Sequence, residues 1–213
     1  MLSAVPRVIA EAQTSGRRRR SEAKKTAILN AAETLFVAEG YDRTSVDAIA
    51  ARAQVSKRTV YDHFGDKETI FQRVLERVND ALITAIRTAI EEELPPGRDP
   101  RDALTAFARR IANRTFASSD YLAFRRLESQ QPPIQLPAAA RDRPERMLQE
   151  RFAELAAAGV IRAPDPALAA RHFTALTISL ALDAVINRRT DTPPPELDAI
   201  IADGVDAFLR AYR

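Results

Sequence analysis

The sequence predicts an all-α fold in two parts, a three-helix N-terminal domain with a helix-turn-helix and a C-terminal helical bundle. Apolar residues recur at helical spacing along the chain, and no sustained alternation of the kind found in strands is present. Prolines and glycines cluster between the helical runs. Two of these runs are very short and lie about three residues apart, as a helix-turn-helix requires. We expect helices at about 21–39, 45–52, 56–63, 67–93, 101–117, 119–130, 134–142, 144–158, 166–188 and 195–212.

Prolines and glycines mark where these helices end. None of the 13 prolines lies between Arg7 and Leu94, and 12 of them fall at or after Pro95. Four glycines follow helical runs, where a left-handed C-terminal cap is wanted: Gly40, Gly65, Gly97 and Gly159. Gly204 is the exception, because it lies inside the last helical pattern.

Composition excludes several classes of protein. With 29% charged and 46% hydrophobic residues, the 213-residue chain is typical of a soluble globular protein with a sizeable core. The most apolar stretch, 172–182, is too short for a membrane-spanning helix, which needs about 18 residues. No signal-peptide pattern is present, and the absence of cysteine excludes disulfides and thiolate sites. We therefore expect a cytoplasmic protein with no membrane partner.

Positive charge is concentrated near the N-terminus. Segment 17–25 holds six cations against the single carboxylate of Glu22, whereas the net charge of the whole chain is only +3. A cationic arm on a slightly acidic body suits attraction to phosphate, on nucleic acid or on an anionic membrane. The alternative is a solvated leader without a partner. We expect residues 1–20 to form a flexible basic arm whose charged side chains are Arg17, Arg18, Arg19 and Arg20.

The segment from Thr44 to Phe64 predicts the helix-turn-helix itself. Its apolar residues fall where two crossing helices must interlock, with the small Ala50 allowing close approach. We expect Thr44 and Asp47 to form a capping box at the first short helix and Ser56 to cap the second. Asp66 is expected to cap the following long helix.

Helical geometry indicates what the second short helix presents to solvent. At roughly 100° per residue, an inward Val60 turns Arg58, Thr59, Tyr61 and Asp62 away from the core. An exposed helix of this kind can enter the major groove of DNA, where arginine reads guanine. The alternative is that Arg58 and Asp62, four residues apart, form only an exposed ion pair.

These residues resemble the DNA-binding signature of the tetracycline-repressor (TetR) family. The resemblance covers about 45 residues and rests on an ordered set: Thr44-Ser45, Ile49-Ala50, Val55-Ser56-Lys57, Thr59-Val60-Tyr61, and Phe64 followed by Lys67-Glu68. Two positions depart from the family pattern. Gln54 stands where the turn usually has glycine, which costs about 1 kcal/mol if its φ is positive. Arg58 occupies a position often held by a small residue.

The resemblance implies a homodimeric transcriptional regulator, usually a repressor, that binds a palindromic operator on double-stranded DNA and responds to a small-molecule effector. Residues 21–66 would form the DNA-binding domain and residues 67–213 the ligand-binding and dimerisation domain. Tyr61 and His63 could instead pack at the domain edge, and Lys57 could be a solvated charge. By this resemblance, Thr44, Ser45, Tyr61, His63 and Lys67 would hold phosphates, and Lys57, Arg58 and Thr59 would approach bases.

The C-terminal half indicates less. Helices 166–188 and 195–212 carry broad apolar faces, which predict a four-helix dimer interface or, alternatively, a monomeric core. The interface candidates are Phe173, Leu180, Ile200, Val205, Phe208 and Leu209. A polar stripe around Leu176, made of His172, Ser179 and Asp183, predicts a ligand cavity or a solvated helix edge. The walls of such a cavity would be Phe107, Phe116, Tyr121, Phe124 and Phe152. Because these aromatic residues lie at helical spacing, the alternative is that they are core residues.

An enzyme is the least favoured class. The two histidines lie in different predicted regions, and the sequence has no nucleophile elbow, phosphate-binding loop, dinucleotide fingerprint or spaced metal ligands. We expect no catalytic residue, metal or cofactor. Two other hypotheses stay open beside a sequence-specific regulator, namely a sequence-independent architectural DNA-binding protein and an all-helical interaction scaffold.

Overall fold

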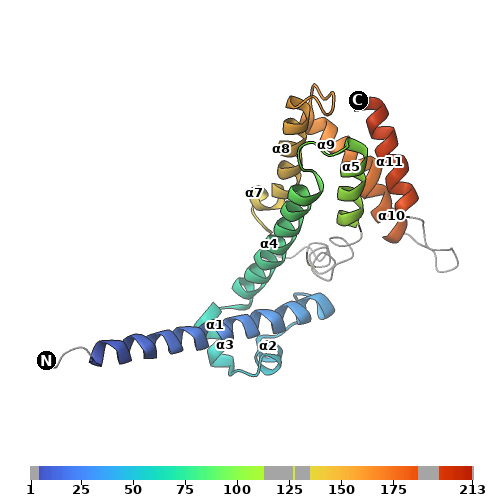
Figure 1. Cartoon of the computed structure of the whole chain (residues 1–213). Helices are drawn as coiled ribbons and strands as arrows, with labels where there is room; N and C mark the ends of the chain where they lie inside the picture. Colours follow the sequence, from blue (N-terminus) through green and yellow to red (C-terminus); the bar gives the residue numbers. More distant parts are fainter. Residues whose placement is uncertain (1–4, 113–126, 128–134, 187–196, 213) are drawn as a thin grey trace. The chain divides into compact units, whose positions relative to one another are not determined.

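The computed structural model describes residues 5–112, 127, 135–186 and 197–212, and all regular structure in them is helical. The predicted all-α class is therefore confirmed. The chain forms two compact units, one of residues 1–77 with 123–136 and the other of residues 78–122 with 137–213. The division falls inside helix α4 (Lys67–Glu93), which is labelled in Figure 1.

The N-terminal unit contains α1 (Val5–Glu39), α2 (Val46–Arg52), α3 (Lys57–Phe64) and the start of α4. In Figure 1, α2 and α3 lie together along one side of α1. The core of the unit is fully buried and draws on every one of these helices: Ile28, Phe36, Ile49, Val60, Ile70 and Phe71. The rings of Phe36 and Phe71 meet edge to face at 5.0 Å, which ties α1 to α4.

Helix α1 begins earlier than the sequence predicted. It starts at Val5 rather than near residue 21, so the basic segment lies on the helix. No proline follows Pro6 in this stretch, and Ala, Glu and Arg are strong helix formers. The helix therefore continues through a segment whose apolar spacing gave no indication of it.

Side-chain caps define the helix-turn-helix, with one correction to the prediction. The Ser45 hydroxyl accepts a hydrogen bond from the Ala48 N–H at 3.1 Å, so Ser45, and not Thr44, caps α2. Ser56 caps α3 through the Thr59 N–H at 3.0 Å, as predicted. The predicted cap by Asp66 is also confirmed, with its carboxylate 2.7 Å from the Thr69 N–H.

Left-handed backbone occurs at the predicted glycines and at one other residue. Gly40, Gly65, Gly97 and Gly159 all have positive φ, as their places after helices require. Gln54 has φ 55° in the turn between α2 and α3. The departure from glycine at this position therefore carries the expected conformational cost.

The C-terminal unit is built around four phenylalanines. These rings belong to α5 (Pro100–Arg110), α8 (Arg143–Ala157), α9 (Pro166–Thr174) and α11 (Leu197–Tyr212). Phe107, Phe152, Phe173 and Phe208 are at most 1% exposed. Ring centroids within the cluster lie 5.4 to 6.1 Å apart, so the four helices share one aromatic core. The short helix α7 (Ala138–Arg141) precedes α8.

Gly204 is explained by the helix that it faces. The predicted helix 166–188 consists of α9, a π-helical turn η2 (Ala175–Ser179) and α10 (Leu180–Ile186). A Cβ atom on Gly204 would lie only 2.1 Å from the carbonyl oxygen of Leu176 in η2. Glycine is required here because the backbones of α11 and η2 are in close contact.

Most of the residues predicted to form a dimer interface are buried within the single chain. Phe173, Val205 and Phe208 are fully buried within one chain, and Leu209 is only 6% exposed. Their apolar faces are used by the aromatic core, so they are not available to a second chain. Leu180 is 51% exposed and Ile200 is partly exposed. Among the described residues, no helix is long and apolar enough to cross a membrane.

Candidate nucleic-acid interface and ligand cavity

Helix α3 presents the face that the sequence predicted. Val60 is 1% exposed and anchors the helix in the core, whereas Tyr61 is 44% exposed. Arg58 and Asp62 are also exposed, and Thr59 is partly exposed. The side chains expected to approach bases therefore project from the first turn of an exposed helix.

Each cation at the start of α3 has an acidic partner. The Lys57 ammonium lies 2.9 Å from the carboxylate of Asp47 on α2, and this hydrogen bond raises the pKa of Lys57. Arg58 lies 3.8 Å from Asp62, one turn further along the same helix. The Arg58 side chain is still 88% exposed, and exposed pairs of this kind contribute little to stability. Arg58 is therefore accessible to a partner, while Lys57 also holds α2 and α3 together.

Lys67 and Thr44 form a clasp at the start of α4. The Lys67 ammonium donates to the carbonyl oxygens of Tyr41 and Thr44, at 3.0 and 3.2 Å, and lies 4.2 Å from the Tyr41 ring centroid. Burial raises the pKa of Tyr41, helped by nearby carboxylates such as Glu68. Thr44 is 1% exposed, and its N–H and hydroxyl both donate to the carbonyl oxygen of Gly40. Both donors of Thr44 are thus engaged within the chain, and the phosphate contact by its side chain stays a prediction.

The other predicted phosphate ligands lie around this clasp. Ser45 is exposed, and its oxygen accepts from the Ala48 N–H while the hydroxyl hydrogen can still donate. His63 is half-buried, with its ring centroid 6.4 Å from that of Phe64. Two of the three Lys67 hydrogens are used by the clasp, which leaves one for a phosphate oxygen.

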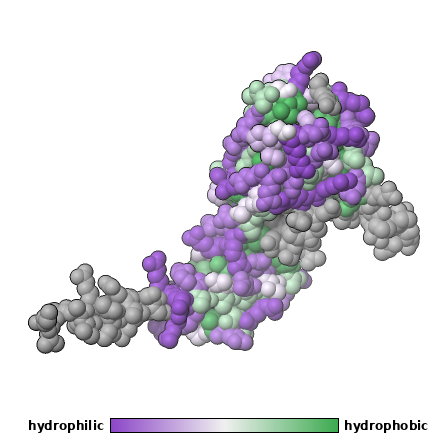
Figure 2. All heavy atoms as spheres, viewed as in Figure 1, coloured by the Kyte–Doolittle hydropathy of each residue, from purple (hydrophilic) through white to green (hydrophobic). Residues whose placement is uncertain are grey.

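The basic segment provides exposed charge on the same unit. Arg18, Arg19 and Arg20 are exposed on α1, while the side chain of Arg17 lies outside the described residues. Figure 2 shows a dense hydrophilic strip on α1 beside the grey N-terminal stretch. Segment 26–70, which contains the helix-turn-helix, carries two more acidic than basic residues. The cationic field of this unit therefore comes mainly from residues 17–25 of α1.

Two participants were missed in the sequence. Asp47 was assigned to a cap but pairs with Lys57 across the turn, and Tyr41 was assigned no role but receives Lys67. The only signal in the sequence is the opposite charge of Asp47 and Lys57 on two short helices that are expected to cross. Nothing in the sequence indicates the Tyr41 contact, because it joins residues 26 positions apart.

A cavity in the C-terminal unit contains two of the predicted pocket residues. It has a volume of about 380 Å³, within the range of small-molecule sites, and Phe107 and Ser179 line it with Ile86, Ile111, Leu148 and Ile178. We refer to it as the Phe107 cavity. Phe152 lies in the aromatic core instead. His172 is hydrogen-bonded to Tyr212, with 2.6 Å between the Nδ1 atom and the hydroxyl oxygen. Leu176 and Asp183 are not among its lining residues, and Phe116, Tyr121 and Phe124 lie outside the described residues.

Two family models match the two ends of the chain. Residues 28–74 match the model of bacterial regulatory proteins of the tetR family. Residues 102–213, more than half of the chain, match the C-terminal domain of AefR-like transcriptional repressors. The chain belongs to the tetR family of transcriptional regulators. These regulators bind DNA and typically act as dimers.

Individual relatives agree with this assignment. The transcriptional activator FasR of Mycolicibacterium smegmatis is 35% identical over 92 residues, which is 43% of this chain and 42% of FasR. The chain thus spans about two-fifths of the length of such relatives. A crystal structure described as a TetR-family regulator from Mesorhizobium loti has 30% identity and a TM-score of 0.69, covering 91% of this chain and 98% of that one. The flavonoid-responsive regulator FrrA has 28% identity and a TM-score of 0.66, covering 89% and 97%.

Proposed function

We propose that this TetR-family regulator is a ligand-responsive repressor that binds a palindromic operator as a homodimer. One observation carries the proposal, namely the exposed first turn of α3, in which Arg58 projects from a helix held in the core by Val60. Such a helix fits the major groove, and a two-fold symmetric pair of such helices reads a palindrome. We further expect a cytoplasmic protein, since its partner is chromosomal DNA.

Within this proposal, bases and phosphates are contacted by different side chains. Arg58 donates two hydrogen bonds to guanine, with Thr59 and Lys57 beside it. Ser45, Tyr61, His63 and the remaining hydrogen of Lys67 hold phosphate oxygens and set the register of α3 on the duplex. Arg17, Arg18, Arg19 and Arg20 on α1 add charge that the helix-turn-helix lacks, and they reach along the DNA backbone or into a minor groove.

The repressor role and the response to a ligand rest on the C-terminal half. Its match to AefR-like repressors supports repression rather than the activation named for FasR. The Phe107 cavity supports an effector that is largely apolar, with Glu145 and Arg171 near it to orient polar groups. FrrA, which is described as responsive to flavonoids, offers aromatic compounds as a first set of ligands to test.

Dimerisation is proposed through the exposed side of α9, η2 and α10. Leu168 and Leu180 are large apolar side chains that are 37% and 51% exposed on this side. Large apolar side chains of this kind are typically covered by a partner chain. A second copy would bury them by two-fold packing of the same helices.

Selection from random duplex DNA at near-physiological salt, with the full-length protein, tests this function. A two-fold symmetric motif in the bound pool is the expected result and supplies the operator for ligand screening. A bound pool without a motif would favour a sequence-independent architectural protein. Failure to retain DNA, both alone and with candidate effectors, would favour an interaction scaffold.

A further inference from the structure

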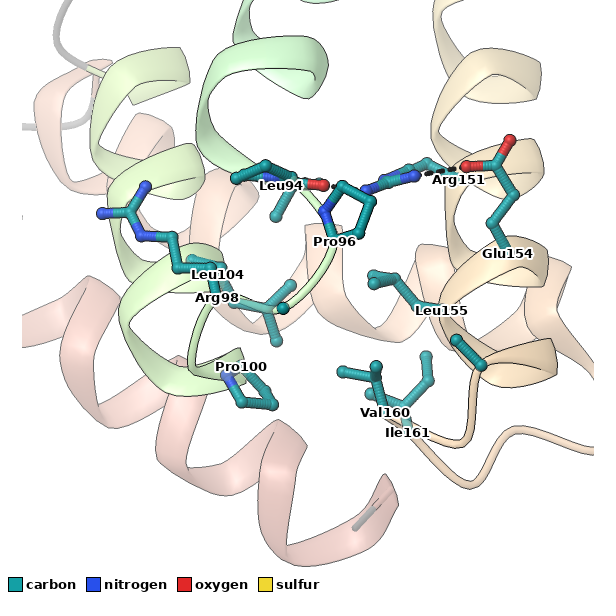
Figure 3. Close-up of a pocket in the computed structure, with 14 residues that line it drawn as sticks. Leu94, Pro96, Arg98, Pro100, Leu104, Arg151, Glu154, Leu155, Val160 and Ile161 are labelled. Carbon is teal, nitrogen blue, oxygen red and sulfur yellow. Dashed lines mark hydrogen bonds and ion pairs between the residues drawn. The ribbon is translucent and has the colours of Figure 1, made fainter.

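A second cavity lies in the C-terminal unit at the point where α4 ends and α5 begins. We call it the α4–α5 cavity; it has a volume of about 330 Å³ and shares no lining residue with the Phe107 cavity. Figure 3 shows Leu104, Leu155, Val160 and Ile161 around it, below the side chain of Arg151. Its size is at the small end of ligand-binding pockets.

Rigid and well-packed residues form the walls of this cavity. Leu94 and Leu104 are 1% exposed and Ile161 is 3% exposed, so their side chains are held by the core behind them. Pro96 and Pro100 line the cavity from the connection between α4 and α5. Because proline restricts φ, this connection has few alternative conformations. The apolar walls of the cavity are therefore formed before any ligand arrives, which lowers the entropic cost of binding.

Arg151 supplies the polar group of the cavity. Its guanidinium pairs with the Glu154 carboxylate and donates to the carbonyl oxygen of Leu94 (Figure 3). The Nε atom of Arg151 is buried and has no hydrogen-bond partner. A buried N–H without an acceptor is unfavourable. A ligand with an uncharged hydrogen-bond acceptor would therefore be stabilised here. A ligand carboxylate would not, because Glu154 already neutralises the charge of the guanidinium.

Arg98, the other cationic residue that lines the cavity, does not add an unpaired positive charge to it. The Arg98 side chain lies to one side of the cavity in Figure 3 and pairs with Glu93, with 3.1 Å between nitrogen and oxygen. Glu93 is also paired with Arg110, and these hydrogen bonds, the one from Arg110 above all, lower the pKa of Glu93. Both cationic groups near the cavity are thus already paired with carboxylates.

We propose that the α4–α5 cavity binds a small, uncharged, mostly apolar molecule that carries one carbonyl oxygen. The apolar body contacts Leu104, Leu155 and Val160, and the oxygen accepts a hydrogen bond from Arg151 Nε. Because neighbouring atoms cover Nε, the Arg151 side chain turns slightly toward the oxygen on binding. A single ring with a short substituent fits the volume. The site acts independently of the proposed DNA binding.

Methyl NMR of the full-length protein tests the location with acetophenone as the probe. Saturable shifts are expected at the methyl groups of Leu104, Leu155, Val160 and Ile161, with the Phe107-cavity methyl group of Ile178 unchanged. Shifts confined to Ile178 would overturn the proposal. Shifts confined to Met147, which lies with Arg151 beside a neighbouring hollow of about 360 Å³, would do the same. So would the absence of any saturable shift.

Ligand chemistry tests the role assigned to Arg151. Ethylbenzene has nearly the shape of acetophenone but no oxygen, and it is expected to bind about three- to tenfold more weakly. Benzoate, which adds a negative charge, is also expected to bind more weakly than acetophenone. Equal affinity for ethylbenzene, or tighter binding of benzoate, would overturn the carbonyl assignment.

Matched variants complete the test. Arg151→Met keeps an unbranched side chain but removes every N–H donor, so acetophenone and ethylbenzene should bind it equally. Leu155→Trp fills the cavity and should weaken acetophenone at least tenfold, whereas Ser179→Trp, which fills the Phe107 cavity, should leave it unchanged. The opposite pattern between these two variants would overturn the site. If Leu155→Trp does not fold, the methyl shifts of the unchanged protein decide the matter.

Discussion

In the N-terminal unit the short helices α2 and α3 turn polar side chains toward solvent, whereas in the C-terminal unit α5, α8, α9 and α11 turn aromatic side chains toward one another. The first arrangement is held by local contacts such as the Ser45 and Ser56 caps. The second depends on rings from Phe107 to Phe208, about 100 residues apart. Recognition of DNA is therefore expected to depend on individual exposed residues, and ligand binding on the packing of the whole unit.

Gly204 offers the largest expected effect and tests the packing side of this comparison. Helix propensity alone predicts that Gly204→Ala is stabilising by about 1 kcal/mol. The close approach of α11 to Leu176 predicts the opposite sign, with a loss of about 3 kcal/mol. Urea unfolding followed by circular dichroism measures the change. The exposed neighbour Asp203→Ala is the control, and equal stability of the two variants would show that the close contact is absent in solution.

The basic segment tests the electrostatic side of the N-terminal unit. Replacing Arg17, Arg18, Arg19 and Arg20 together by glutamine should lower the slope of log affinity against log salt by as much as about four. Fluorescence anisotropy with labelled operator at several salt concentrations gives the slope. Four exposed arginines of the other unit serve as the matched control for net charge: Arg141, Arg143, Arg162 and Arg210. If both quadruple variants change the slope equally, only net charge matters.

Arg58 tests recognition at a single position. Arg58→Ala should weaken operator binding about ten- to hundredfold and relax the preference for one base pair. Asp62→Asn removes the ion pair but leaves the arginine, and it should preserve the preference. Selection with both variants compares them directly. A preference unchanged in Arg58→Ala would support the simpler interpretation of an exposed ion pair.

Gln54 gives the smallest expected effect. Gln54→Gly should stabilise the N-terminal unit by about 1 kcal/mol, because glycine adopts φ 55° without the Cβ clash. Gln54→Ala keeps the clash and should change the free energy of unfolding very little. Thermal unfolding of both variants measures the difference. Equal melting temperatures would mean that the turn relaxes to accommodate a side chain.

Much of the N-terminal unit could be predicted because its determinants are local. The spacing of Ile49, Val55 and Val60 and the cap at Ser56 act within a few residues. The start of α1 at Val5 was missed because that segment has no helical apolar pattern, whereas the error at the cap concerns two alternatives of equal local quality. Thr44 and Ser45 are adjacent hydroxyl residues, and the backbone geometry chose the second as the cap.

The contacts of the C-terminal unit could not be predicted in the same way, because they join residues far apart in the sequence. Apolar faces on α9 and α11 indicate that both are covered, but not whether the cover is the same chain or a second one. Phe173 and Phe208 proved to face each other, with ring centroids 5.5 Å apart. The α4–α5 cavity had no counterpart in the sequence analysis, because its walls come from two segments about 50 residues apart, 94–104 and 151–161.

The sequence by itself determined the all-α class, the position of the helix-turn-helix and the side chains on the exposed face of α3, since helical periodicity and caps act over a few residues. Only the tertiary structure decided that Lys67 clasps the Tyr41 and Thr44 carbonyl groups, that Gly204 admits the η2 backbone and that Arg151 covers a cavity. Each of these contacts joins residues brought together by packing, and packing depends on the shapes of side chains far apart in the chain.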